Sequence, residues 1–392
     1  MSQQAQSKIF PPPRLEADDE RDRAIALREL LAPREGEHHV VAIQDFPDPD
    51  AISSAMAYRT IARTFGIETE ILYNGLISHP ENLALVNLLD IQITRYTEAL
   101  SLEQFDAAVF VDNQGTTTRL TPRLQAAGVP TLAVIDHHDA QEVLDPIYVD
   151  VRNVGAAATQ MTDYLRSGVF LEMDADDPQH VKLATALMHG LHSETDRFLK
   201  AGKAEYAAAA FLSHFIDTGQ LERVLCVEKS RGTMDTIQQA LEHRTIRGGL
   251  AVSGVGYIRW PDRDAIPQAA DFLLTEENVN TVVVYGIVCD EDEREVVSGS
   301  LRTNNATMTV NSFLGEALGK DARDRPYGGG RSRAGGFEID LGFLAGDGDP
   351  VSRESKWSLF DAQIRRKLFA AAGLETGEAD QEIECTDPPE DI

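Results

Sequence analysis

Short apolar runs and helical segments alternate along the first third of the chain, and this alternation limits the possible folds more than any other feature. The apolar runs lie at 39–43, 69–73, 107–111 and 131–135, and helical patterns fill the sequence between them. Strand–helix repeats joined by short loops fold as a parallel, doubly wound sheet with helices on both faces. We therefore expect an α/β domain at the N-terminus.

A second, smaller α/β domain is expected after residue 247, because strand-like and helical patterns resume there. We expect a cleft between the two domains, where a ligand would bind. The predicted organisation is a flexible N-terminus at 1–14, a first domain at 15–218, a helical linker at 219–247, a second domain at 248–345, and a C-terminal helix with an acidic tail at 346–392.

The charge balance excludes one class of function. The chain has 36 Lys and Arg against 64 Asp and Glu, a formal net charge of −28, and few of the basic residues are Lys. This is not the composition of a general basic nucleic-acid binder, although an enzyme that contacts phosphate locally is still allowed. An acidic, Lys-poor surface stays hydrated in molar salt, so we expect a halophilic, haloarchaeal source.

The three cysteines and the apolar runs indicate the cellular compartment in which the protein is expected. The cysteines lie far apart and form no metal-binding or disulfide pattern. The first residues show no apolar signal segment, and no run is long enough to span a membrane. We therefore expect a cytoplasmic protein without a membrane partner. The sequence leaves open whether it forms a homodimer.

Three of the expected strands end in acidic or histidine residues. The first runs into Gln44, Asp48 and Asp50, the third into Asp112, and the fourth into Asp136, His137 and His138. In a parallel sheet these ends share the carboxyl edge, where ligands bind. So many carboxylates need a counter-charge, because like charges raise one another's pKa. Oxygen ligands with one or two imidazoles suit Mn²⁺ or Mg²⁺.

These motifs resemble those of the DHH phosphoesterase family. Asp136-His137-His138 follows an apolar strand as the family's signature does, and Asp112 ends an earlier strand. The first motif reads Gln44-x-x-x-Asp48-x-Asp50-Ala51, and a fourth, helical motif contains Glu194. The four motifs occur in the family's order and together cover residues 40–200.

The resemblance implies two metal ions, Mn²⁺ or Mg²⁺, bridged by a hydroxide. By position, one ion would be bound by Gln44, Asp48 and Asp112, and the other by Asp50, Asp112, His137 and Glu194. His138 would contact the substrate phosphate, and Asp136 would hold the imidazoles by hydrogen bonds. The implied catalytic residues are thus Asp112, Asp136, His137 and His138.

The chain departs from the family pattern at two ligands. Gln44 occupies the position of a histidine, and an amide oxygen is a poorer ligand than a neutral imidazole. Glu194 replaces an aspartate and is one methylene longer, so Asp196 is an alternative ligand at this place.

The second expected domain contains a glycine-rich segment, Tyr327–Gly336, with two arginines. We expect its glycines to turn so that N–H groups face an anion, beside the planar guanidinium groups. The segment resembles the glycine-rich motif of the family's associated C-terminal substrate-binding domain, with Arg331 at a histidine position. The predicted substrate-binding residues are His138, Arg302, Gly329, Gly330, Arg331 and Arg333.

The resemblance implies hydrolysis of short oligonucleotides or small nucleotides by an oligoribonuclease-like exonuclease, a group that includes nanoRNases. Alternative substrates within the family are cyclic di-AMP, 3′-phosphoadenosine 5′-phosphate and polyphosphate. A non-catalytic nucleotide sensor is an alternative of another class, and Gln44 is the observation that motivates it.

Overall fold

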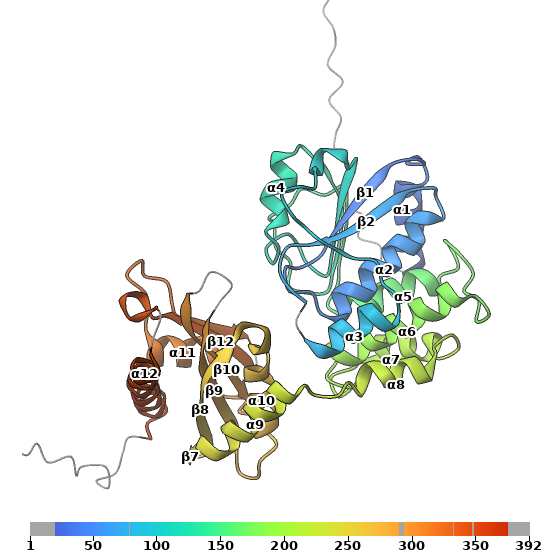
Figure 1. The fold of residues 1–392 in the computed structure, drawn as a ribbon. Helices are drawn as coiled ribbons and strands as arrows, with labels where there is room; N and C mark the ends of the chain where they lie inside the picture. The colour runs from blue at the N-terminus through green and yellow to red at the C-terminus, as the bar shows by residue number, and fades with distance from the viewer. Residues whose placement is uncertain (1–19, 78, 290–293, 332, 347–348, 375–392) are drawn as a thin grey trace, which may run out of the picture. The chain divides into compact units, whose positions relative to one another are not determined.

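The computed structural model describes residues 20–77, 79–289, 294–331, 333–346 and 349–374 (Figure 1). They form two compact units that divide between Val227 and Glu228. The expected flexible segment at 1–14 and the acidic end of the chain after residue 374 lie outside the described residues.

A parallel sheet forms the centre of the first unit, with the strand order β3-β2-β1-β4-β5-β6. The prediction of a doubly wound parallel sheet is confirmed. The strands are β1 (His38–Ala42), β2 (Glu68–Tyr73), β3 (Thr94–Arg95), β4 (Ala107–Val111), β5 (Thr131–Asp136) and β6 (Tyr148–Val151).

Both faces of this sheet are buried, which is why its strands read as continuous apolar runs. Alternate residues point to opposite faces: Val41 and Val109 pack in the core that includes α1, α2 and α5, whereas Phe110 packs with Leu120 and Leu124 of α4 on the other face (Figure 1). The helices are α1 (Glu20–Leu31), α2 (Pro49–Arg63), α3 (Pro80–Leu88), η1 (Leu102–Gln104), α4 (Leu120–Ala126), α5 (Ala157–Arg166), α6 (Pro178–Glu194), α7 (Lys203–Leu212) and α8 (Thr218–Leu225).

The second unit has a mixed sheet with the order β11-β12-β10-β9-β8-β7, in which only the β8–β9 pair is parallel among the described strands. Helices α11 and α12 cover one face, and α9 and α10 cover the other. Its elements are α9 (Arg231–His243), β7 (Thr245–Arg247), β8 (Leu250–Arg259), η2 (Trp260–Asp262), α10 (Ala265–Leu273), β9 (Thr281–Cys289), β10 (Glu295–Thr303), α11 (Val310–Leu318), β11 (Gly328–Arg331), β12 (Ala334–Asp340), η3 (Gly342–Leu344) and α12 (Pro350–Ala371).

The segment 219–247, expected to be a linker, contributes helices to both units. Helix α8 packs on α3 and α6 of the first unit, and α9 packs on β8 and α10 of the second. The connection between the units is therefore shorter than the expected segment.

Candidate metal centre

The carboxyl ends of β1, β4 and β5 lie together at one edge of the first sheet, because β4 pairs in parallel with both neighbours. The direction of chain progression reverses between β1 and β4, and such a reversal opens a crevice in which α/β proteins bind ligands. The last residue of α6 also reaches this edge. The residues gathered here are Gln44, Asp48, Asp50, Asp112, Asp136, His137, His138 and Glu194.

Asp112 is fixed at this edge by its backbone. Its φ of 55° lies in the left-handed region that residues other than glycine rarely adopt, and its N–H donates to Ile135 O at 2.9 Å. The Asn113 side chain secures the turn by donating to Ala42 O and Val111 O. Asp112 is 3% exposed, and its Oδ1 has no hydrogen-bond partner among the described residues. A buried carboxylate oxygen without a donor is costly unless a cation binds it.

His137 directs its Nε2 at the same point. Its Nδ1 lies 3.2 Å from Val154 O, which can only accept a hydrogen bond, so in the neutral imidazole that a metal ion needs the proton is on Nδ1 and the lone pair on Nε2. Nε2 lies 3.3 Å from Asp112 Oδ1, 3.7 Å from Asp50 Oδ2 and 4.0 Å from Glu194 Oε1. It makes no hydrogen bond within the described part of the chain. One imidazole and three carboxylates thus meet at one point, which is a donor set that suits a divalent cation once the imidazole is neutral.

Asp50 is oriented by the first turn of α5. Its Oδ2 accepts a hydrogen bond from Ala157 N and its Oδ1 from Ala158 N, each at 2.7 Å. The N-cap residue of this helix is Ala156, which has no side chain able to cap. Asp50 therefore takes the place of the missing cap, and the helix amides fix the direction in which its carboxylate faces.

Three carboxyl groups of this centre, those of Asp50, Asp112 and Glu194, resist ionisation in the absence of a cation. Burial, together with the charges of Asp48 and Glu194, raises the pKa of Asp50 to about 7, although His137 opposes the rise. Burial and the charge of Asp50 raise the pKa of Asp112 well above its usual range. Burial and Asp48 also raise the pKa of Glu194. A bound cation would reverse these shifts, so the residues present fit a divalent metal.

Asp136 holds the two histidines in place. Its Oδ1 accepts from the His137 N–H and from His138 Nδ1, both at 2.8 Å, and its Oδ2 accepts from Gln114 Nε2 at 2.7 Å. Burial opposes ionisation of Asp136, but the hydrogen bonds from His138 and Gln114 outweigh it and lower the pKa. Since its Nδ1 is engaged, the partly exposed His138 has Nε2 free to face a substrate. Ligand atoms of Asp112, Asp136, His137 and His138 all lie within 4.8 Å of one another.

The Gln44 side of the centre has a different arrangement. Gln44 Nε2 donates to Asp48 Oδ2 at 2.8 Å, and Asp48 Oδ1 accepts from Ala51 N at 2.9 Å as the N-cap of α2. Both oxygens of Asp48 therefore already have donors. A cation on this side has to compete with the Gln44 amide.

Helix α6 brings Glu194 to the centre and leaves Asp196 outside it. Glu194 Oε1 lies 4.0 Å from His137 Nε2. Asp196 is exposed, and its Oδ2 lies 3.5 Å from Lys200 Nζ. Of the two candidate ligands, Glu194 is the one that lies beside His137 Nε2.

The expected conformation of the glycine-rich segment is wrong. Gly328, Gly329 and Gly330 form the edge strand β11 rather than a turn, and the Gly330 N–H donates to Asn311 Oδ1. Glycine is needed here for close packing: a Cβ at Gly330 would lie 2.2 Å from Ala334 O. The turn falls after β11, next to the exposed Arg333, and the Arg331 side chain lies outside the described residues.

Arg302 on β10 is held on the α10 face of the second sheet. Its Nε donates to Asp271 at 2.7 Å, and its Nη1 donates to Ser300 Oγ at 2.8 Å. Its guanidinium group is therefore oriented by α10 and by the strand itself.

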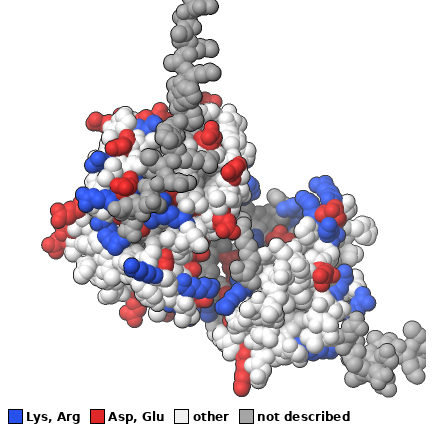
Figure 2. Space-filling model, turned by 180° about the vertical axis from the view of Figure 1, so that it is seen from behind, with Lys and Arg blue, Asp and Glu red and all other residues white. Residues whose placement is uncertain are grey.

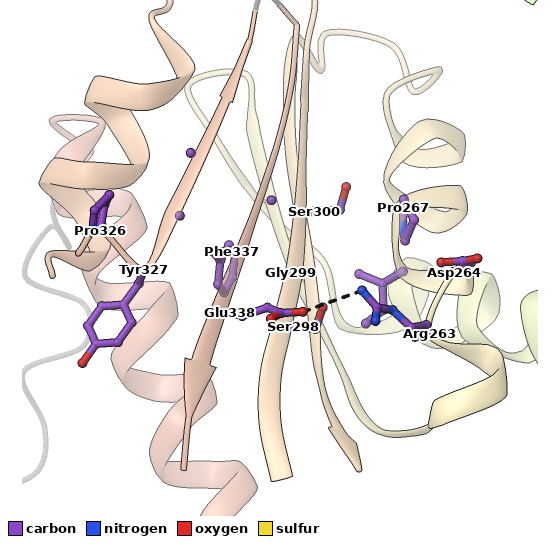
Figure 3. A pocket seen from close by; sticks show the side chains of 14 residues that line it. Arg263, Asp264, Pro267, Ser298, Gly299, Ser300, Pro326, Tyr327, Phe337 and Glu338 are labelled. Atoms are coloured by element: carbon purple, nitrogen blue, oxygen red, sulfur yellow. Dashed lines mark ion pairs between the residues drawn. The ribbon is translucent and has the colours of Figure 1, made fainter. Parts of the chain in front are cut away.

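A cavity of about 610 Å³ opens on the same face of the second sheet, next to β10, β11 and β12 (Figure 3). Ser298 and Ser300 of β10 lie at its floor, between Arg263 beside α10 and Tyr327 beside β11. Arg263 Nη2 lies 3.6 Å from Glu338 Oε1, so an ion pair crosses this floor. Among the predicted substrate-binding residues that the structure fully describes, Gly329 lines this cavity.

Figure 2 shows one face of the molecule with Lys and Arg side chains interspersed among Asp and Glu, and with much uncharged surface between them. This pattern agrees with the exclusion of a general basic nucleic-acid binder, because basic side chains do not cover the face shown.

The sheet edge and its carboxylates and histidines define an α/β domain with a candidate divalent-metal centre. Residues 39–191, within the first unit, match the family model described as "DHH family, N-terminal domain". The chain is 34% identical over 335 residues to an uncharacterized protein of Methanocaldococcus jannaschii. That alignment covers 85% of this chain and 63% of the relative, so the chain spans less than two thirds of the relative's length.

Two further proteins are similar over different extents. The chain is 33% identical over 131 residues to a probable manganese-dependent inorganic pyrophosphatase of Bacillus cereus, which covers 33% of this chain and 41% of that protein. An exopolyphosphatase-related protein from Bacteroides fragilis has a similar fold, with a TM-score of 0.62 at 14% identity over 88% of this chain and 98% of that chain. In the part of the chain that the structure describes, none of the helices has the length and apolar character needed to cross a membrane.

Sequence reasoning missed the groups that orient the ligands. Gln114 stands two residues after Asp112 at the same strand end, and that position is a signal by which it could have been found. The Val154 carbonyl and the Ala157 and Ala158 amides act through the backbone, so their residue types carry no signal.

Proposed function

We propose that this chain is a divalent-metal-dependent phosphoesterase that hydrolyses short oligonucleotides or small nucleotides. The observation that carries the proposal is the convergence of His137 Nε2 and Asp112 Oδ1, 3.3 Å apart, both without a hydrogen-bond donor within the described residues. The match of residues 39–191 to the DHH family domain supports this chemistry.

The ligands of one Mn²⁺ or Mg²⁺ ion would be Asp50, Asp112, His137 and Glu194, and a second ion would use Asp112, Asp48 and Gln44. Bound cations there would activate water and neutralise the charge that develops on phosphoryl oxygens. Asp136 keeps His138 Nδ1 engaged, so that His138 Nε2 faces the phosphate. Asp50 receives its orientation from α5.

The second unit would bind the rest of the substrate. Arg302, Arg331 and Arg333 are proposed to contact phosphate oxygens, with Gly329 and Gly330 providing an edge that lacks side chains. A guanidinium group suits this role because its planar donors match two phosphate oxygens.

One substrate panel tests the proposal. The full chain would be assayed in high KCl with Mn²⁺ or Mg²⁺ against a 5′-phosphorylated dinucleotide, 3′-phosphoadenosine 5′-phosphate, cyclic di-AMP, polyphosphate and pyrophosphate. We expect the dinucleotide to be turned over fastest, and Asp112→Ala to abolish the activity. Faster turnover of another substrate would reassign the substrate class, and no turnover with either metal would overturn the enzyme proposal.

A non-catalytic nucleotide sensor is the second candidate, favoured by the hydrogen bond between Gln44 and Asp48. A sensor would bind nucleotide without metal-dependent turnover, and Gln44→His would create activity. If the chain is an enzyme, the unmodified chain already shows this activity. Calorimetric titration with the same panel, alongside the assay, distinguishes the two.

A further inference from the structure

The segment 152–157 places backbone groups against two of the proposed ligands. Val154 O lies 3.2 Å from His137 Nδ1 and, in the neutral imidazole that a metal ion needs, keeps the proton there and the lone pair on Nε2. Immediately afterwards, the Ala157 and Ala158 amides bind Asp50. Any shift of this segment would change both the tautomer of His137 and the orientation of Asp50.

Glu205, in the first turn of α7, holds this segment from a distance of 50 residues in sequence. Its Oε1 accepts from Gly155 N at 2.7 Å and from Thr159 Oγ1 at 3.3 Å, and its Oε2 accepts from Gly202 N at 2.7 Å. Glu205 is 3% exposed. One buried carboxylate therefore caps its own helix with one oxygen and binds the 152–157 segment with the other.

The packing around Gly155 also connects the Glu205 carboxylate to a third proposed metal ligand, Glu194. A Cβ at Gly155 would lie 2.9 Å from Glu205 Cγ and Cδ and 3.1 Å from Thr195 Cγ2, so Gly155 is closely enclosed by both residues. Thr195 follows Glu194 directly and is the C-cap of α6. Glu205 thus stands where the 152–157 segment meets the helix end that carries Glu194.

The charge of Glu205 suits this role. Burial opposes its ionisation, but the hydrogen bonds from the Gly155 and Gly202 amides outweigh burial and lower the pKa. Hydrogen bonds to an ionised acceptor are stronger than those between neutral groups, so the carboxylate holds the segment more firmly than an amide side chain does.

We propose that Glu205 is a positioning residue for metal binding, which fixes the 152–157 segment and through it the His137 tautomer and the Asp50 carboxylate. This inference rests on the proposed function, since it concerns the same metal centre. Groups that orient metal ligands in this way typically change metal affinity by about 10- to 100-fold when they are removed.

The test compares Glu205→Gln and Glu205→Ala in the full chain. Glu205→Gln preserves the shape and one acceptor, and Glu205→Ala removes both. The matched control is Asp217→Asn, because Asp217 caps α8 through the Gln220 amide as Glu205 caps α7. None of the hydrogen bonds of the Asp217 side chain described for this chain reaches the 152–157 segment.

Two readouts are needed: Mn²⁺ affinity by calorimetry, and the His137 tautomer in the metal-free protein by ¹⁵N NMR. We expect Mn²⁺ affinity to fall about tenfold or more in both Glu205 variants, the Nδ1–H tautomer of His137 to lose its dominance, and Asp217→Asn to match the parent. If Glu205→Ala does not fold, Glu205→Gln decides alone.

An unchanged His137 tautomer in the folded Glu205 variants would overturn the proposal, whatever the affinity, and Glu205 would then be only a helix cap. A parent that binds no Mn²⁺ would instead contradict the proposed function. The tautomer measurement would still decide the role of Glu205, because it needs no metal.

Discussion

Gln44 donates from Nε2 to Asp48 Oδ2 at 2.8 Å, while 3.3 Å separates two unpartnered acceptors, His137 Nε2 and Asp112 Oδ1. The centre is therefore asymmetric. On the His137 side the acceptors lack a donor and need a cation, whereas on the Gln44 side an amide already satisfies the carboxylate. The two proposed metal ions would consequently bind with different affinities.

Replacing the Gln44 amide with an imidazole should strengthen metal binding on the Gln44 side of the centre. We expect Gln44→His to raise the affinity of the second Mn²⁺ ion by about tenfold or more, because a neutral imidazole is a better ligand and no longer donates to Asp48. Calorimetric titration of Mn²⁺ gives both affinity and stoichiometry. Gln44→Ala is the control, since it removes the amide without adding a ligand. Equal binding by Gln44→His and Gln44→Ala would contradict the prediction.

Asp112→Asn should change the stability of the metal-free protein and its metal affinity in opposite directions. The pKa of Asp112 is raised by burial and by the charge of Asp50, so its ionised form destabilises the metal-free fold. A neutral amide of the same shape removes this repulsion and should therefore stabilise the metal-free protein. The same change should weaken Mn²⁺ binding by about 100-fold or more.

Chemical denaturation at pH 8 in EDTA measures the stability change, and calorimetry measures the affinity. Asp196→Asn is the matched control, because Asp196 is exposed and pairs with Lys200 instead of facing His137. A loss of stability in metal-free Asp112→Asn would show that Asp112 is not repelled by its neighbours.

The edge strand of the second unit should tolerate no side chain at Gly330. A Cβ there would lie 2.2 Å from Ala334 O and 2.7 Å from Val310 Cγ1. We expect Gly330→Ala to destabilise the second unit by about 2 kcal/mol, within the range for overpacking. Gly315→Ala in α11 is the control, since a Cβ at Gly315 meets nothing within 4 Å, and it should stabilise by about 0.5–1 kcal/mol. Scanning calorimetry compares the two, and equal melting temperatures would refute the packing argument.

Much of the first unit could be predicted because its sheet is buried on both faces. The runs that contain Val41, Val109 and Val134 are apolar along their length, so the strands are visible without any partner. The gathering of Asp112 and His137 at one sheet edge also follows from parallel pairing alone.

The remaining features depend on contacts that the sequence does not show. Gly328–Gly330 have low strand propensity, and their pairing with β12 and packing on Val310 make them a strand. Helix α9 joins the second unit because it packs on β8 and α10. The approach of Glu205 to Gly155 bridges 50 residues and has no local signature.

The metal-free protein should lose stability as the pH rises from about 4 to about 7. The pKa of Asp50 is raised from an ordinary value of 3.8 to about 7 in the folded state, chiefly by burial. Between these values the folded state holds a proton that the unfolded chain has released, so the free energy of unfolding falls with pH, by at most about 1.4 kcal/mol per unit for one proton. Above about pH 7 this contribution is constant. Urea unfolding in EDTA from pH 4 to 8 measures the slope, which Asp50→Asn should reduce and saturating Mn²⁺ should suppress because the bound cation keeps Asp50 ionised. If the free energy of unfolding falls with pH as steeply in Asp50→Asn as in the parent, a group other than Asp50 holds the proton.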